Sequence, residues 1–132
     1  MFSKTVTYKD YNDQEATETF LFNLTKAELM EWEMDENGGL VETLEKITKA
    51  NNKQALMKYF KKLVLMSYGV KSTDGKRFIK NDEVRAAFAE HPAFSDIFVE
   101  FATNSKSAAA FVNGILPSDL NDAKKTVAPA AM

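Results

Sequence analysis

The hydrophobic pattern of this sequence changes abruptly at Thr25, and this change constrains the fold more than any other feature. Residues 16–24 mostly alternate between apolar and polar side chains, which is typical of a half-buried strand. Thr25 and Glu28 then form a capping box, in which each side chain accepts a hydrogen bond from the backbone N–H of the other residue. Leu24 precedes the cap and can pack on Leu29, which fixes the angle between strand and helix. The sequence therefore predicts a strand that runs directly into a helix.

The first 24 residues as a whole predict a β-hairpin. Residues 2–8 alternate as residues 16–24 do, and the segment 10–13 between them consists largely of Asp and Asn, which favour turns. Because a two-stranded hairpin alone is only marginally stable in water, we expect it to pack on an apolar surface supplied by the rest of the chain.

Helices are predicted along most of the remaining sequence, with boundaries taken from capping residues, prolines and glycines. The stretch 70–81 breaks this pattern with an Asp74–Gly75 turn between short extended arms. The predicted helices span 25–36 with a stop at 37–39, 40–50, 53–68, a segment from Asn81 or Asp82 to just before Pro92, a segment starting at Pro92, and a segment capped by Ser105 or Ser107 and stopped by Gly114 and Pro117. The predicted fold class is α+β, an N-terminal β-hairpin packed on a mainly α-helical bundle of five to six helices.

The length of 132 residues is that of one compact domain. We assign residues 1–117 to a single globular α+β domain. Residues 118–132 are small, polar and rich in alanine, without apolar periodicity, and we expect them to form a flexible C-terminal tail.

Residue usage argues against an enzyme and against a metal or cofactor site. The chain has no cysteine and a single histidine, His91, which excludes zinc–thiolate clusters, thiol nucleophiles and multi-histidine metal sites. His91 precedes a proline and is expected at a helix junction rather than as a general base. The acidic run 31–36 is expected to be the solvated face of a helix, and no phosphate-binding glycine loop is present.

The charge balance and the hydropathy of the sequence argue against nucleic acid and membranes as partners. A formal charge of −2 is unsuited to electrostatic capture of nucleic acid by the whole surface. The lysines of 53–62 are expected to be the solvated side of an amphipathic helix, and a regulator that contacts nucleic acid through this face is a minor alternative. The N-terminus has no signal peptide pattern, and no apolar run approaches the roughly 20 residues that span a bilayer. We therefore expect no membrane association and a cytoplasmic location.

The aromatic content points to a protein partner. Ten phenylalanines are present, and although most are expected in the core, their number exceeds what one small core hides. The surplus rings predict a partner-binding groove, and the candidate residues are Phe94, Phe98, Phe101 and Phe111. In addition, the open edge of the hairpin favours pairing between copies, so a homo-oligomer is possible.

Several short phrases, taken in chain order, resemble one family of phage proteins. They are Lys4-Thr5-Val6-Thr7-Tyr8, Phe22-Asn23-Leu24-Thr25-Lys26-Ala27-Glu28-Leu29, Gly38-Gly39-Leu40, Ser67-Tyr68-Gly69-Val70-Lys71-Ser72, Asp74-Gly75-Lys76-Arg77-Phe78 and Ala110-Phe111-Val112-Asn113-Gly114-Ile115-Leu116-Pro117. Over residues 4–117 the chain is similar to the tail assembly chaperones of long-tailed bacteriophages.

The resemblance implies a non-enzymatic function in virion morphogenesis. It implies a chaperone that binds the long helical tape measure protein, keeps it soluble and promotes assembly of the tail tube protein around it, in the host cell cytoplasm. The alternative is a small structural virion protein, such as a tail-completion or head–tail connector component. The resemblance fixes no individual binding residues.

Overall fold

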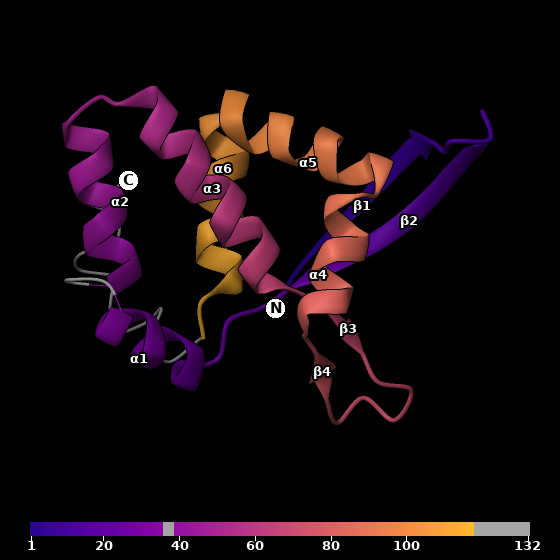
Figure 1. Ribbon diagram of the computed structural model, residues 1–132, viewed down its shortest axis with the longest axis horizontal. Coiled ribbons are helices and arrows are strands. Elements are labelled where there is room, and N and C mark those ends of the chain that lie inside the picture. Colours follow the sequence, from indigo (N-terminus) through magenta and orange to yellow (C-terminus); the bar gives the residue numbers. More distant parts are fainter. Residues whose placement is uncertain (36–38, 118–132) are drawn as a thin grey trace.

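The chain has an N-terminal antiparallel sheet and six helices over the described part. The computed structural model describes residues 1–35 and 39–117. The sheet has the strand order β1-β2-β3-β4, with neighbouring strands antiparallel (Figure 1). The strands are β1 (Phe2–Lys9), β2 (Glu15–Phe22), β3 (Tyr68–Lys71) and β4 (Phe78–Ile79). The prediction of an α+β fold with an N-terminal hairpin is confirmed.

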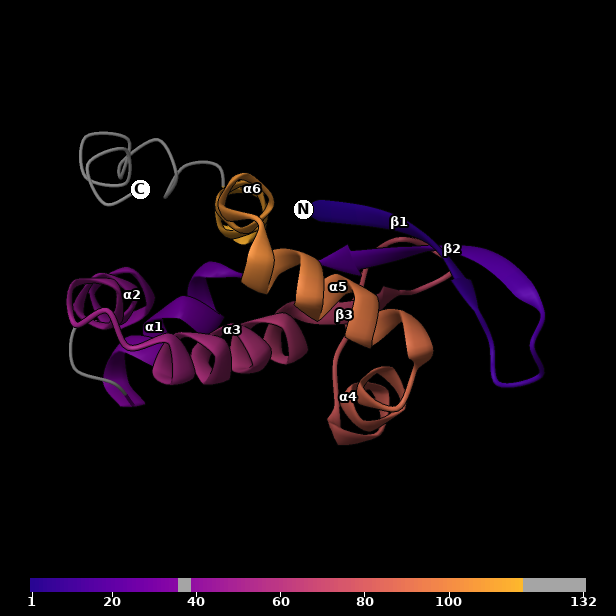
Figure 2. The ribbon, with the colours of Figure 1, turned by 90° about the horizontal axis from the view of Figure 1, so that it is seen from above.

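The helices follow the predicted order. They are α1 (Lys26–Asp35), α2 (Gly39–Lys49), α3 (Lys53–Ser67), α4 (Asp82–Ala89), α5 (Pro92–Thr103) and α6 (Ser105–Ile115). Helices α1 and α2 pack on each other at the end of the molecule far from the hairpin, and α3 and α5 lie between them and the hairpin tip (Figures 1 and 2). The long β1–β2 ribbon extends beyond the helices on the other side (Figure 2).

The hairpin alternates as the sequence predicts. The odd-numbered residues of β1 are exposed, and the even-numbered ones are partly buried against the helices. On the exposed face, hydroxyl groups pair across the two strands at 2.9 Å, Thr5 with Thr19 and Thr7 with Thr17. On the inner face of β2, Phe22 is completely buried. The ribbon thus rests on an apolar surface, as its marginal stability alone requires.

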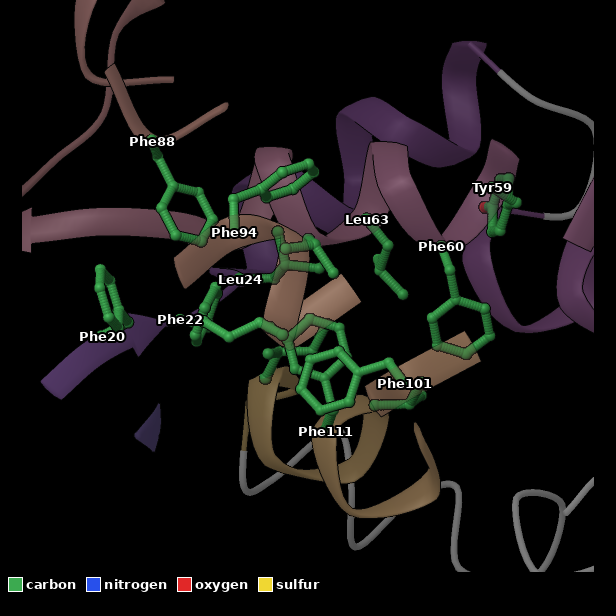
Figure 3. Packing of buried hydrophobic residues seen from close by; sticks show 14 of the residues in the cluster. Phe20, Phe22, Leu24, Tyr59, Phe60, Leu63, Phe88, Phe94, Phe101 and Phe111 are labelled. Carbon is green, nitrogen blue, oxygen red and sulfur yellow. The ribbon is translucent and has the colours of Figure 1, made fainter. Parts of the chain in front are cut away.

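The core is dominated by aromatic rings from both the sheet and the helices (Figure 3). Phe22 and Phe111 meet edge to face at 5.5 Å between ring centroids, and Phe101 stacks on Phe111 at 4.5 Å. Edge-to-face and offset ring pairs contribute about 0.5–1.5 kcal/mol beyond the area that they bury. These rings join β2, α5 and α6 into one core.

Local capping signals account for most helix starts. The capping box forms as predicted, since the N–H of Glu28 donates to the Thr25 hydroxyl at 3.2 Å and the N–H of Thr25 donates to the Glu28 carboxylate at 2.8 Å. Asn52 caps α3 and Asn81 caps α4. Pro92 occupies the first turn of α5, where its missing N–H leaves no unsatisfied donor.

Three predicted helix ends are wrong. Helix α6 is capped by Asn104, whose side chain accepts from the N–H groups of Lys106 and Ser107, and not by Ser105 or Ser107. Gly114 lies within α6 and does not stop it. Helix α3 ends at Ser67 rather than residue 68, because Tyr68 pairs with Phe22 in the sheet. Of the predicted stop at 37–39, residues 37 and 38 lie outside the described residues, and Gly39 is the first residue of α2. The predicted tail 118–132 also lies outside the described residues.

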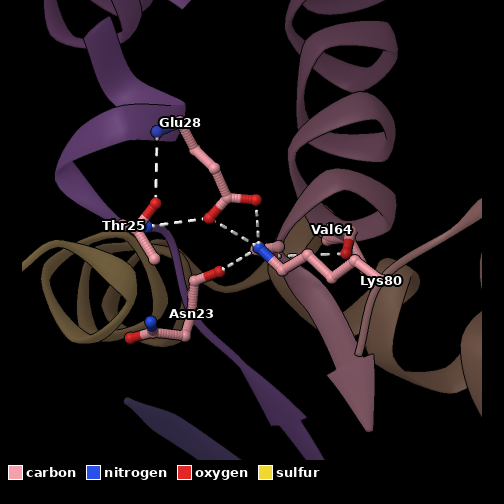
Figure 4. Close-up of polar contacts among 6 residues, drawn as sticks. Asn23, Thr25, Glu28, Val64 and Lys80 are labelled. Carbon is pink, nitrogen blue, oxygen red and sulfur yellow. Dashed lines mark hydrogen bonds and ion pairs between the residues drawn. The ribbon is translucent and has the colours of Figure 1, made fainter. Parts of the chain in front are cut away.

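A polar cluster fixes the start of α1 against the segment after β4 (Figure 4). The Lys80 ammonium donates to both carboxylate oxygens of Glu28, at 2.9 and 2.8 Å, and to the backbone carbonyl of Asn23 at 2.6 Å. Burial lowers the pKa of Lys80, and the hydrogen bonds and charge of Glu28 partly oppose this. The cluster joins residues more than 50 positions apart.

Candidate interaction surface

The four predicted partner-binding rings form two stacked pairs and lie mostly inside the molecule. Phe94, Phe101 and Phe111 belong to the buried core, with exposed fractions of 9%, 3% and 0%. Phe98 is partly buried and stacks on Phe94 at 6.1 Å between centroids. In this structure three of the four rings therefore contribute to packing, and Phe98 alone among them keeps more than marginal contact with solvent.

Exposed apolar side chains occur on the same helix, on its outer side. Val99 is 53% exposed. It lies two positions from Ile97 and from Phe101, both buried, and successive residues of a helix are about 100° apart. Val99 therefore points away from the core. In the sequence, its position outside the helical spacing of the buried residues Ile97 and Phe101 could have identified it as exposed.

The outer side of α5 carries little charge. We define the α5 outer face as Ser95, Phe98, Val99 and Ala102, which lie one turn apart along the helix. Ser95, Val99 and Ala102 are exposed. The solvated face of a typical surface helix is rich in charged residues. The α5 outer face has none of its own, and Asp96 is the exposed charged residue of α5.

The two acidic groups of α5 differ in environment. Glu100 accepts a hydrogen bond from the Lys4 ammonium of β1 at 2.5 Å, and this contact lowers the pKa of Glu100. Asp96 is exposed to solvent. The charge of Glu100 is therefore compensated within the molecule and adds little negative potential to the α5 outer face.

The neighbouring helix α3 presents a basic surface. Helices α3 and α5 pack against each other, and α3 contains lysines but no acidic residue. Its four lysines are all exposed: Lys53, Lys58, Lys61 and Lys62. The Lys62 ammonium lies 5.1 Å from the centre of the Trp32 ring, so this lysine also contributes a cation–π contact to the packing of α1 on α3.

Met57 adds an apolar side chain to the exposed surface of α3. Its side chain is 46% exposed. Tyr59, two positions along the helix, is buried, and the centroid of its ring lies 5.9 Å from that of the Trp32 ring. Tyr59 is therefore buried through its contact with α1. The hydrophobic pattern of α3 alone does not reveal this contact.

His91 has a structural role at the junction of α4 and α5, as its sequence context predicted. Its Nδ1 accepts a hydrogen bond from the N–H of Ala93 at 3.1 Å and thereby caps α5. Its Nε2 lies 3.4 Å from the carboxylate of Glu18, and its ring meets the rings of Tyr8 and Phe20 edge to face. The imidazole therefore holds the hairpin against the helices.

The described part of the chain shows neither a metal-binding cluster nor a membrane-spanning helix. Within residues 1–35 and 39–117, no three His, Asp or Glu side chains are grouped so as to hold a metal ion. None of the helices in the described part of the chain has both the length and the apolar character needed to cross a bilayer. The α5 outer face, on a helix that packs against the lysine-bearing helix α3, is the candidate surface for binding a protein.

A small α+β domain with a weakly charged helix face beside a basic helix has the features of a protein-binding module. Residues 1–131 match the family model described as phage tail assembly chaperone, and the chain belongs to this family. No curated protein and no solved structure matches the chain. Its general role is therefore in the assembly of phage tails.

Proposed function

We propose that the chain is a non-enzymatic chaperone that binds the tape measure protein, keeps it soluble and promotes assembly of tail tube protein around it in the host cell cytoplasm. The family assignment supports the general role. The observation that carries the finer proposal is the exposed, nearly uncharged α5 outer face, on a helix that packs against the lysine-bearing helix α3. An amphipathic helix buries its apolar side in such a surface.

The chemistry of the surface defines the client segment that it fits. Val99 and the accessible part of Phe98 offer apolar contact on α5. Lys58 and Lys61 are exposed on the adjacent α3. The complementary ligand is a helix with an apolar stripe and acidic residues along one flank, because opposite charges at the rim of an interface favour encounter and set the orientation.

The rings chosen from the sequence take different parts in this proposal. Phe98 contacts the client directly, since it is the one of the four with accessible surface. Phe94, Phe101 and Phe111 support α5 from beneath and hold it in place. A role for these three in direct contact would require the core to open.

Co-expression with the tape measure protein of the same phage tests the proposal. The wild-type chain is expected to raise the soluble fraction of the tape measure protein and to be recovered with it in a pull-down. Val99→Asp places a charge on the α5 outer face and is expected to weaken this binding about tenfold, which corresponds to about 1.4 kcal/mol. Val70→Asp is the matched control, because Val70 on β3 is 44% exposed and lies outside the α5 outer face.

The lysines are tested separately by charge reversal. The double variant Lys58→Glu, Lys61→Glu is expected to bind more weakly and to lose the salt dependence of the wild-type complex, because the attraction of exposed charges is screened by salt. If Val99→Asp and Val70→Asp bind alike, the assignment of the surface is wrong. Recovery of the chain in stoichiometric amount from purified virions would instead favour a structural virion protein.

A further inference from the structure

Among the residues that the structure describes, the outer strand of the sheet, β1, has a strand partner on one side only. β1 pairs with β2 and ends the strand order. It is eight residues long, as is β2, while β3 and β4 have four and two. Figure 2 shows β1 along the outer margin of the sheet, with α6 near its N-terminal end. A long outer strand of this kind is a template for a further strand.

The register determines which backbone groups face outward. The N–H of Asp10 donates to the carbonyl of Gln14 at 2.8 Å, which continues the pairing of Lys9 with Glu15. In an antiparallel ladder hydrogen bonding alternates along the strand, so the even-numbered residues of β1 bond to β2. On the far side of β2 the N–H of Asn23 donates to Ser67, as this alternation requires of an odd-numbered residue.

Four residues of β1 therefore direct their N–H and C=O groups away from β2. They are Ser3, Thr5, Thr7 and Lys9. Their side chains lie on the exposed face of the hairpin.

The middle of β1 lacks the features that keep outer strands from pairing. β1 contains no proline, and Thr5, Val6 and Thr7 are uncharged. Lys4 points toward the helices, where Glu100 neutralises it. Nothing in the centre of the strand repels another strand.

We propose that two copies of the chain pair through β1, antiparallel and about a twofold axis at Val6, to form a continuous eight-stranded sheet. A twofold axis perpendicular to the sheet requires opposing residue numbers to have an even sum. A sum of 12 places Val6 opposite Val6 of the second copy and Thr5 opposite Thr7 of the second copy. All four outward-facing residues then have partners across the interface.

The charge pattern of β1 favours a second copy as the occupant. In this register Lys4 faces Tyr8 of the second copy, and Lys9 faces Ser3 of the second copy, so that no two lysines oppose each other. The hydroxyls of Thr5 and Thr7 already pair with hydroxyls of β2 at 2.9 Å. In the dimer they also face Thr7 and Thr5 of the second copy, so the row of hydroxyls continues across the axis. The backbone groups that pair belong to β1 and not to the α5 outer face.

Sedimentation equilibrium on the full chain tests the pairing. The expected mass is twice the 14.8 kDa of one chain. The double variant Thr5→Lys, Thr7→Lys brings like charges opposite each other at the axis and is expected to be monomeric. The double variant Thr17→Lys, Thr19→Lys is the matched control. It removes the same hydroxyl pairs on the same face of the hairpin, but its lysines lie on β2, away from the proposed interface. This variant is expected to remain dimeric. A monomeric wild-type chain, or a dimer that persists in both variants, overturns the proposal.

A cysteine at the axis tests the register without a disruptive charge. The chain has no cysteine, so Val6→Cys introduces a single thiol. Residues opposite each other in a non-hydrogen-bonded pair have Cα atoms about 4.5 Å apart, which a disulfide spans. Mild oxidation is expected to convert Val6→Cys to a covalent dimer at least tenfold faster than Tyr11→Cys, whose position is 83% exposed at the hairpin tip. Equal rates for the two variants overturn the register.

Discussion

Lys80 and Glu28 form a two-point ion pair across 52 positions of sequence, with the ammonium 2.9 and 2.8 Å from the two carboxylate oxygens. Glu28 is also half of the capping box that starts α1. One carboxylate therefore serves a local and a long-range contact together. Its geometry as a helix cap follows from the sequence, while its pairing with Lys80 follows from the tertiary fold.

Replacement of Lys80 by methionine should destabilise the protein more than loss of a surface ion pair. The Lys80 side chain is only 10% exposed, and its removal leaves Glu28 and the carbonyl of Asn23 without this donor. We expect the free energy of unfolding in urea to fall by about 1–3 kcal/mol. Lys46→Met is the control, because its pair with Glu42 spans 3.9 Å at an exposed site and contributes about 0–0.5 kcal/mol. Equal losses in the two variants would contradict the role of the polar cluster.

The Tyr8 phenol should lose its proton at a higher pH than a free tyrosine. Its hydroxyl donates to the Glu18 carboxylate at 2.6 Å, and this hydrogen bond, with smaller effects of burial and of nearby negative charge, raises the pKa of Tyr8 to about 12. Absorbance at 295 nm follows the titration. In Glu18→Gln the pKa of Tyr8 should fall toward 10, whereas Glu15→Gln, on the same strand, should leave it near 12.

The sign of the effect on stability follows from the direction of this shift. The pKa of Tyr8 is higher in the folded state than the value of 10.0 for the free side chain. The contribution of the Tyr8–Glu18 contact to stability is therefore complete below pH 10 and is lost as the pH rises through 12. Glu18→Gln should flatten the pH dependence of the urea midpoint in that window, and an unchanged slope would argue against the contact.

The fold could be predicted from the sequence where local signals determine structure. The capping box at Thr25 and Glu28, the cap at Asn81 and the proline at the start of α5 all depend on neighbours within four positions. The end of α3 could not be predicted in this way. Tyr68 continues the helical pattern, but its backbone pairs with Phe22, 46 positions earlier, and a register of this kind is invisible to a local pattern.

In the candidate site, too, local sequence patterns predict some features, whereas others depend on tertiary contacts. Composition indicated more rings than a small core hides, but burial depends on how the elements pack. Phe111 lies on a helix whose own pattern leaves several orientations open, and only the contacts with Phe2, Phe22 and Phe101 reveal that it is central. Val99 was identifiable in principle, since it lies off the stripe formed by Ile97 and Phe101.

Gly114 should not tolerate alanine, although alanine is the better helix former by about 1 kcal/mol. A Cβ at this position would lie 2.7 and 2.9 Å from the Cδ1 and Cβ atoms of Phe2, closer than carbon atoms approach. We expect Gly114→Ala to lower the free energy of unfolding by about 1–2 kcal/mol, measured in urea. Gly114→Ala should cost less unfolding free energy in a Phe2→Leu background than in the wild-type chain, because the smaller side chain leaves more room for the new Cβ. An equal cost in the two backgrounds would show that the two residues do not meet.

Truncation of α5 and α6 side chains should separate the rings that hold the fold from the residues that bind a client. Phe111 is completely buried, and Phe111→Ala removes ring contacts to both the sheet and α5. We expect it to cost about 3–5 kcal/mol of unfolding free energy. Val99→Ala, at a site 53% exposed, should change stability by no more than about 0.5 kcal/mol.

The two variants should behave oppositely when stability and binding are compared. If the α5 outer face binds the client, Val99→Ala weakens the pull-down at unchanged urea midpoint. Phe111→Ala weakens it only in proportion to the unfolded fraction, so that lowering the temperature or adding a stabilising osmolyte restores binding. A fully folded Phe111→Ala chain that still fails to bind would instead mean that the core opens to admit the client, and the direct role of the buried rings would then be restored.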